Sequence, residues 1–278
     1  MSADELPSWR ETTAKQSIME FVAAVTDPDS PDFIPERDRI AVFDNDGTLW
    51  TEQPVYAQLV FALDRAAELG HPTSLEELHA GGMEALLKLL ALTHAGITTD
   101  EFDAVCRNWL ASARHPRFGR PYPATVYQPM VELLGLLDRN GFSCWIFSGG
   151  GTDFMRTWTA DGYGLPPHRV IGSVGETEFR IGDGGPELVK TARSGSSTTG
   201  RRSPARFTGT SGSARSWPPG TPTATWPCSS GPQPARTGPW NWSFTTPTVT
   251  GSTPTTVTRS WVVAPARSSP LPPRASGP

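Results

Sequence analysis

The sequence predicts an α/β protein built on a doubly wound parallel sheet, with an all-helical insertion and a disordered C-terminal tail. Two short apolar runs, residues 39–43 and 142–147, each end abruptly in a polar loop, as buried parallel strands do. Apolar residues between these runs recur at helical spacing over residues 55–113. The composition changes sharply near Lys190. The 278 residues suffice for one or two domains.

The remaining elements follow in chain order. A short helix is expected over residues 17–25, and turn residues end it at 28–35. A helix at 130–139 starts after Pro129 and stops at Asn140-Gly141. A helix at 154–160 and a third strand at 169–174 follow the second strand. This strand, helix, strand order indicates a parallel sheet with crossover helices.

The tail differs chemically from the rest of the chain. All 28 acidic residues precede residue 191, whereas residues 191–278 contain nine arginines and no Asp, Glu or Lys. Of these last 88 residues, 47 are Ser, Thr or Pro. Such a segment cannot bury enough apolar surface to offset the entropy of ordering it, so we expect it to be largely disordered.

Two carboxylates stand at the end of the first predicted strand, in Asp44-Asn45-Asp46-Gly47-Thr48. They would repel each other unless a hard cation such as Mg²⁺ bound between them, and that cation would attract a phosphate. One carboxylate could then attack phosphorus while the other protonates the leaving oxygen. Gly47 permits a tight turn, and the Thr48 hydroxyl could bind phosphate oxygens. An ordinary polar turn is the alternative interpretation.

A second polar loop, Ser148-Gly149-Gly150-Gly151, follows the second predicted strand and precedes a helix. By composition alone it could be a flexible glycine loop. Its position favours an anion site made of a hydroxyl and backbone amides.

The residues 43–50, Phe-Asp-Asn-Asp-Gly-Thr-Leu-Trp, resemble the first motif of the haloacid dehalogenase (HAD) superfamily, and Phe147-Ser148-Gly149-Gly150 resemble its second. The helical insertion is similar to the cap of the phosphoserine phosphatase-like branch. The resemblance implies a Rossmannoid core at residues 38–54 and 126–190 and a cap at 55–125. The N-terminal segment, 1–37, and the tail, 191–278, lie outside it.

The resemblance also implies a function, which is Mg²⁺-dependent hydrolysis of a small phosphomonoester. Asp44 would be the nucleophile and a metal ligand. Asp46 would be the general acid/base and would bind the metal through its backbone carbonyl. Thr48, Ser148 and Gly149 would bind the phosphate. Dehalogenation and a catalytically inactive module that binds metal or phosphate are the alternatives.

The family requires two further elements, a lysine and a second acidic loop, separate from residues 44–48, that completes the metal site. The tail can supply neither, because it has no Lys, Asp or Glu. We expect Lys190 to be a surface lysine. We expect Glu176, Glu178 and Asp183 to be solvated carboxylates rather than metal ligands.

A shift of the reading frame would explain why the composition of the tail differs from that of the rest of the chain. When the codons of residues 219–229 are read from their third base, the free wobble positions permit Gly-Asn-Ser-Asp-Gly-Asp-Leu-Ala-Met-Leu, which resembles the fourth motif of the family. In the same frame, Ser203-Pro204 permit Lys-Pro, and residues 207–217 permit a segment ending in Gly-Lys-Arg-Pro-Val-Leu. We therefore hypothesise a frameshift between about residues 185 and 203. A genuine Ser/Thr/Pro-rich tail is the alternative.

The expected compartment is the cytoplasm. The three cysteines, Cys106, Cys144 and Cys228, are too far apart to suggest a disulfide scaffold or a zinc site, and no secretory signal is readable at the N-terminus. We expect no membrane partner, because no apolar run is long enough to span a bilayer. Nine scattered arginines are a weak signal for nucleic acid, so none is expected as a partner.

Overall fold

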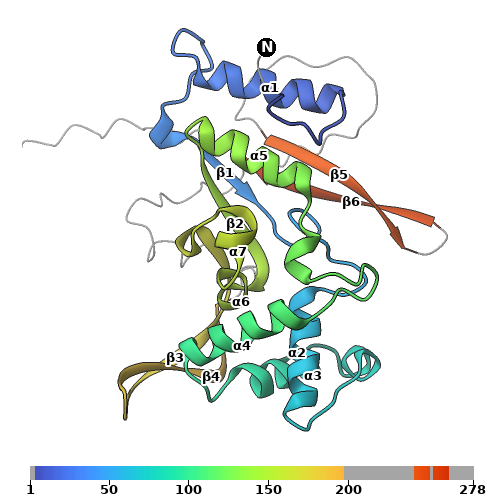
Figure 1. Ribbon diagram of the computed structural model, residues 1–278, viewed down its shortest axis with the longest axis vertical. Helices are drawn as coiled ribbons and strands as arrows, with labels where there is room; N and C mark the ends of the chain where they lie inside the picture. Colours follow the sequence, from blue (N-terminus) through green and yellow to red (C-terminus); the bar gives the residue numbers. More distant parts are fainter. Residues whose placement is uncertain (1–3, 197–240, 251–252, 263–278) are drawn as a thin grey trace, which may run out of the picture.

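A four-stranded sheet forms the centre of the fold. The computed structural model describes residues 4–196, 241–250 and 253–262. The strands β1 (Ile40–Phe43), β2 (Ser143–Gly151), β3 (Val170–Gly182) and β4 (Gly185–Ser196) lie in that order across the sheet (Figure 1). β1 pairs with β2, and β2 with β3, in parallel. The predicted α/β fold class is confirmed, and the three predicted strands are its parallel part.

The fourth strand was not predicted, and it is antiparallel to β3. β3 runs well beyond the predicted 169–174 and turns back at residues 182–185, where Gly185 has a φ of +114°. A turn this short can join only antiparallel neighbours. The sheet is therefore mixed, and β3 and β4 form a long hairpin that projects from the core (Figure 1).

Helices connect the parallel strands and cover the sheet. α5 (Gln128–Arg139) leads into β2 and buries Leu133, Leu136 and Leu137. Between β2 and β3 the chain forms α6 (Thr152–Arg156) and α7 (Thr159–Tyr163). The sequence predicts one helix at 154–160, but Trp158 has a φ of −138°, outside the helical range, which separates the two.

The insertion consists of helices, as predicted. It contains α2 (Ala57–Glu68), α3 (Leu75–His94) and α4 (Thr99–Ser112), which lie at the lower end of Figure 1. Capping boxes start two of them: Ser74 with Glu77 at α3, and Thr98 with Glu101 at α4. In each box a side chain satisfies backbone N–H groups that the first helical turn leaves unpaired.

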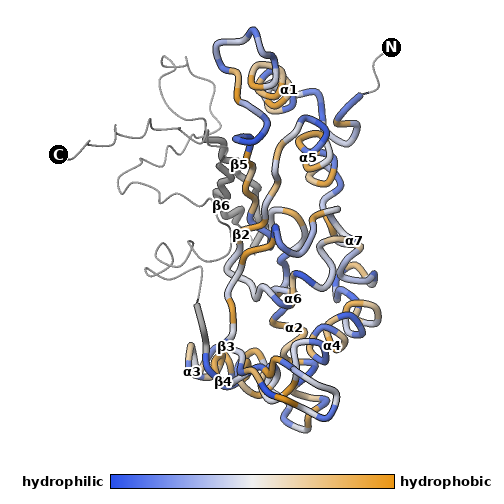
Figure 2. The backbone as a smooth tube through the Cα atoms, turned by 90° about the vertical axis from the view of Figure 1, so that its left-hand side faces the viewer, coloured by the Kyte–Doolittle hydropathy of each residue, from blue (hydrophilic) through white to orange (hydrophobic). Residues whose placement is uncertain are grey.

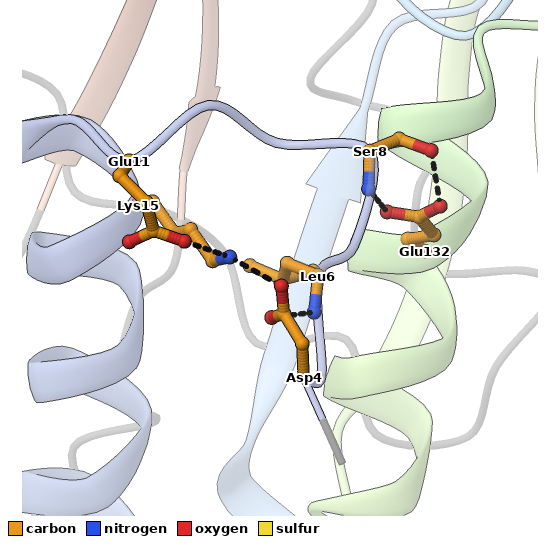
Figure 3. A network of polar contacts seen from close by, with 6 residues as sticks. All are labelled: Asp4, Leu6, Ser8, Glu11, Lys15 and Glu132. Carbon is orange, nitrogen blue, oxygen red and sulfur yellow. Dashed lines mark hydrogen bonds and ion pairs between the residues drawn. The ribbon is translucent and has the colours of Figure 1, made fainter.

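The N-terminal segment is anchored to two helices. In Figure 3, Lys15 of α1 (Thr13–Thr26) contacts the carboxylates of Asp4, at 2.8 Å, and Glu11, at 2.7 Å. Both backbone and hydroxyl of Ser8 donate to Glu132 of α5. α1 and α5 each alternate hydrophobic and hydrophilic residues in Figure 2, and their hydrophobic faces join the core.

The described part of the tail contains a separate two-stranded sheet, β5 (Asn241–Thr250) and β6 (Thr253–Val262). The sequence did not predict these strands. The rest of the tail, for which disorder was expected, lies outside the described residues, and so does Cys228. Three short 3₁₀ helices complete the description: Glu36–Asp38, Tyr122–Thr125 and Pro167–Arg169.

Among the described residues, none of the helices combines the length and the apolar character that a membrane span requires.

Candidate active site

Two segments meet at the carboxyl ends of β1 and β2: residues 44–48, the acidic loop, and residues 148–151, the glycine loop. Phe43 pairs with Ile146 in the parallel register, so Asp44 follows β1 beside the last part of β2. The prediction that residues 148–151 follow the second strand is wrong, since they form the end of β2, where the register with β3 shifts between Phe147 and Gly151. A Cβ atom placed on Gly150 would lie 3.6 Å from Oδ2 of Asp46. The Gly150 N–H donates to the Ser148 hydroxyl at 3.2 Å. The structure therefore brings the acidic loop and the glycine loop together, as expected for the carboxyl edge of a parallel sheet.

The acidic loop is a tight turn that requires glycine at position 47. Gly47 has a φ of +69°, in the left-handed region. A Cβ atom there would also lie 2.6 Å from the carboxyl carbon of Glu52, which is buried. The Asn45 carbonyl accepts N–H bonds from Thr48 and Leu49 and closes the turn. These contacts fix the backbone that carries both aspartates.

Hydrogen bonds from two aromatic side chains and from the loop backbone hold the acidic loop in place. The indole N–H of Trp50 donates to Oδ1 of Asp46 at 2.8 Å. Oδ1 of Asp44 accepts the backbone N–H of Asn45 at 2.8 Å. The hydroxyl of Tyr163 donates to Oδ1 of Asn45 at 3.0 Å. Burial, followed by the nearby charge of Asp46, raises the Tyr163 pKa well above its usual value, so this hydroxyl remains a donor at neutral pH.

The candidate phosphate ligands differ in exposure. The side chain of Ser148 is buried, whereas Gly149 is exposed. The Gly149 carbonyl accepts the hydroxyl of Ser173 at 2.9 Å. The hydroxyl oxygen of Thr48 is sealed from solvent and has no hydrogen-bond partner in the described part of the chain. A buried hydroxyl in this state is an unpaired polar group in the same loop as the two aspartates.

The insertion contacts the glycine loop through Gln58 of α2. Its Oε1 accepts the Gly151 N–H at 2.6 Å. A Cβ atom on Gly151 would lie 2.3 Å from Nε2 of Gln58, so only glycine allows this approach. Sequence reasoning missed Gln58, Tyr163 and the role of Trp50. Trp50 stood within the first motif, but no local signal marked the other two.

The oxygen atoms of the acidic loop suit a hard cation. The Asp44 carboxylate and the Asp46 backbone carbonyl are the ligand type that Mg²⁺ prefers, and Mg²⁺ commonly takes one or two carboxylates with water and substrate phosphate completing its shell. Within residues 4–196 and the two described tail strands, no cluster of three or more His, Cys, Asp or Glu could hold a metal. The site thus fits Mg²⁺ in chemistry but lacks a third acidic ligand in the described chain.

The three lysines of the chain all bind other carboxylates. Lys15 pairs with Asp4 and Glu11, and Lys88 with Glu84. The expectation that Lys190 is a surface lysine is wrong, since it is 5% exposed and pairs with Asp153. The side chain is held between the insertion and α6. As expected, Glu176, Glu178 and Asp183 are exposed.

Lys190 also contacts the helical insertion. Its ammonium lies 4.6 Å from the ring centroid of Phe102 in α4. Its backbone exchanges hydrogen bonds with the insertion, accepting from Gly96 and donating to Ile97. Burial, with the charge of Lys190 adding to it, lowers the pKa of His94 to about 4, so that imidazole is neutral at pH 7.

Asp153→Asn should therefore lower the free energy of unfolding by about 2 kcal/mol, because it leaves a buried ammonium without its counter-charge. The loss is smaller than the ~3–5 kcal/mol of a fully buried pair, since the Asp153 side chain is 35% exposed. Urea denaturation measures the change. Glu84→Gln, which breaks the exposed pair with Lys88, is the control and should have no measurable effect. Equal stability of both variants would contradict the assignment.

Comparison with known proteins gives the family. The family model described as haloacid dehalogenase-like hydrolase matches residues 41–202. No curated protein matches the chain.

Similar solved structures include a phosphoserine phosphohydrolase-like protein from Francisella tularensis, at 21% identity and a TM-score of 0.31, covering 53% of this chain and 62% of that one. A HAD family hydrolase from Salmonella enterica matches at 20% identity and a TM-score of 0.31, covering 54% of this chain and 43% of that one. A protein of unknown function from Anaerococcus prevotii matches at 15% identity and a TM-score of 0.35, covering 66% of this chain and 72% of that one. The chain thus spans less than two thirds of the first and second of these structures. On the extent of the family match, the chain belongs to the haloacid dehalogenase-like hydrolases.

Proposed function

We propose that the chain is a Mg²⁺-dependent phosphatase that hydrolyses a small phosphomonoester through a phosphorylated Asp44. The observation that carries the proposal is the meeting of Asp46 with the Ser148–Gly150 loop at the carboxyl edge of the parallel strands. A phosphate bound to Ser148 and the Gly149 amide would lie beside both aspartates. Family membership supports hydrolysis as the reaction class.

In the first step a carboxylate oxygen of Asp44 attacks phosphorus, and the bond from phosphorus to the leaving oxygen breaks. Asp46 donates its proton to that oxygen, and the alcohol departs. In the second step water attacks the phosphorus of phospho-Asp44, Asp46 accepts the water proton, and Asp44 and inorganic phosphate are released. Mg²⁺ held by the Asp44 carboxylate and the Asp46 carbonyl would offset the negative charge that these carboxylates present to phosphate.

Hydrolysis of p-nitrophenyl phosphate with and without Mg²⁺ tests this function. We expect slow turnover with Mg²⁺, and a loss of about 100-fold or more when EDTA removes the metal, because two carboxylates then face the phosphate uncompensated. Adding Mg²⁺ back in excess of EDTA should restore the rate. Turnover that is indifferent to chelation would contradict the proposal.

A pseudo-enzyme that binds Mg²⁺ and phosphate without turnover is the second candidate. It is favoured by one observation: each lysine of the chain is paired with a carboxylate outside the two loops. Titration calorimetry with inorganic phosphate separates the two functions. Mg²⁺-dependent binding without hydrolysis would support the pseudo-enzyme.

A further inference from the structure

Trp50 is packed tightly in the core and is also hydrogen-bonded to the Asp46 carboxylate. Its side chain is 1% exposed, and its ring stacks on Trp158 with centroids 4.2 Å apart. The same indole donates its N–H to Oδ1 of Asp46 at 2.8 Å. The ring is immobilised by the core, and it therefore fixes the carboxylate that it binds.

The packing around Trp50 connects both loops of the site. Trp158 and Tyr163 follow the glycine loop in sequence and pack against each other at 4.8 Å. Tyr163 in turn donates to Asn45, next to Asp46. Tyr122 lies edge-on to Trp50, with the ring centroids 6.4 Å apart. The acidic loop thus rests on an aromatic cluster, Trp50, Trp158 and Tyr163, which makes two hydrogen bonds to it.

The two carboxylate oxygens of Asp46 consequently have different surroundings. Oδ1 accepts the indole N–H, and Oδ2 lies 3.6 Å from where a Cβ of Gly150 would stand. We propose that Trp50 is a positioning residue, which holds Asp46 by Oδ1 so that Oδ2 is presented to the leaving oxygen of the substrate. This inference rests on the proposed phosphatase function.

The rates of hydrolysis of two phosphate esters distinguish a positioning role of Trp50 from a purely structural one. Phenoxide is a much more basic leaving group than p-nitrophenoxide, so phenyl phosphate depends far more on a proton from Asp46. Trp50→Phe retains an aromatic ring and removes the N–H. We expect kcat/KM for phenyl phosphate to fall by about tenfold or more, and for p-nitrophenyl phosphate by about twofold or less. Equal losses for the two esters would overturn the proposal.

Trp109→Phe is the matched control. Trp109 is also buried, and its indole N–H donates to a carboxylate, Oδ2 of Asp64, at the same distance of 2.8 Å. That pair lies in the insertion, between α4 and α2. This variant should leave the ratio of the two kcat/KM values at its starting value, even where it lowers stability. A change in the ratio equal to that of Trp50→Phe would count against a specific role for Trp50.

A second measurement does not depend on turnover. In a protein labelled with ¹⁵N-tryptophan, the indole N–H resonance of Trp50 is identified by its loss in Trp50→Phe. We expect it to move upfield in Asp46→Ala and to stay near its position in Asp46→Asn, where an amide oxygen can still accept at Oδ1. An unchanged resonance in Asp46→Ala would refute the hydrogen bond. If the chain hydrolyses neither ester, the proposed function fails, and this resonance alone decides whether Trp50 holds Asp46.

Discussion

Asp44→Asn is expected to abolish phosphate-ester hydrolysis, lowering kcat by about 10³-fold or more. The amide oxygen is a poor nucleophile for phosphorus, and it also weakens the site as a ligand for Mg²⁺. The geometry of the loop should survive, because the amide oxygen can still accept the N–H of Asn45 as Oδ1 of Asp44 does. The measurement is steady-state hydrolysis of p-nitrophenyl phosphate at saturating Mg²⁺.

The covalent intermediate gives an independent test of the same residue. After a rapid acid quench during turnover, intact-mass spectrometry should find a phosphoryl adduct on the starting protein and none on Asp44→Asn. Asp183→Asn is the control, since Asp183 is exposed at the tip of the β3–β4 hairpin and should leave both readouts unchanged. Undiminished turnover by Asp44→Asn would remove Asp44 from the role of nucleophile.

The parts of this fold that sequence predicted are those with a strong local signal. Helix α5 was predicted because Pro129 opens it and Asn140-Gly141 closes it, and its apolar residues recur with the helical period. β1 was predicted because a short apolar run ends at two carboxylates. The approach of the two site loops followed from the rule that parallel strands place their carboxyl ends at one edge.

The parts that sequence missed depend on contacts between distant residues. Lys190 follows Glu187-Leu188-Val189, and nothing in these neighbours reveals that its ammonium reaches Asp153, 37 residues earlier. Gln58 lies 93 residues from the Gly151 N–H that it binds. β4 did have a local signal, the glycines at 182, 184 and 185, whose meaning as a hairpin turn was not recognised. Tertiary proximity, rather than propensity, determined these contacts.

The frameshift hypothesis yields the second large prediction. A chain in which the alternative frame is restored after about residue 185 should hydrolyse p-nitrophenyl phosphate about 10²-fold faster or more than the chain as it stands. The restored frame would supply a lysine and the second acidic loop. Removing a single electrostatic stabiliser of a transition state typically lowers kcat by ~10²–10³-fold. The lysines of the present chain are committed to other carboxylates, so none replaces the missing one. Equal activity of the two chains would refute the hypothesis of a disrupted enzyme.

The sheet itself gives a structural reason for the same expectation. Among the described strands β1 lies at the edge of its sheet, although the candidate nucleophile directly follows it, and β6 approaches it without joining that sheet (Figure 1). The restored frame would place an apolar Pro-Val-Leu run shortly before Gly-Asn-Ser-Asp-Gly-Asp, which repeats the pattern of β1, an apolar strand that ends in an acidic loop. Such a strand could pair with the outer edge of β1 and bring its carboxylates beside Asp44.

Two results together would decide between a restored site and a general gain in stability. In the restored chain, Asn in place of the aspartates of Gly-Asn-Ser-Asp-Gly-Asp should return the rate to that of the present chain and weaken Mg²⁺ binding, because carboxylates and not the new strand supply the metal ligands. A restored chain that keeps its high rate after these substitutions would owe the rate to folding alone. The origin of the tail is tested separately, by sequencing the gene on both strands and by mass spectrometry of a tail peptide. If the gene sequence confirms the present frame and the tail peptide is found, the Arg-rich tail is the genuine product.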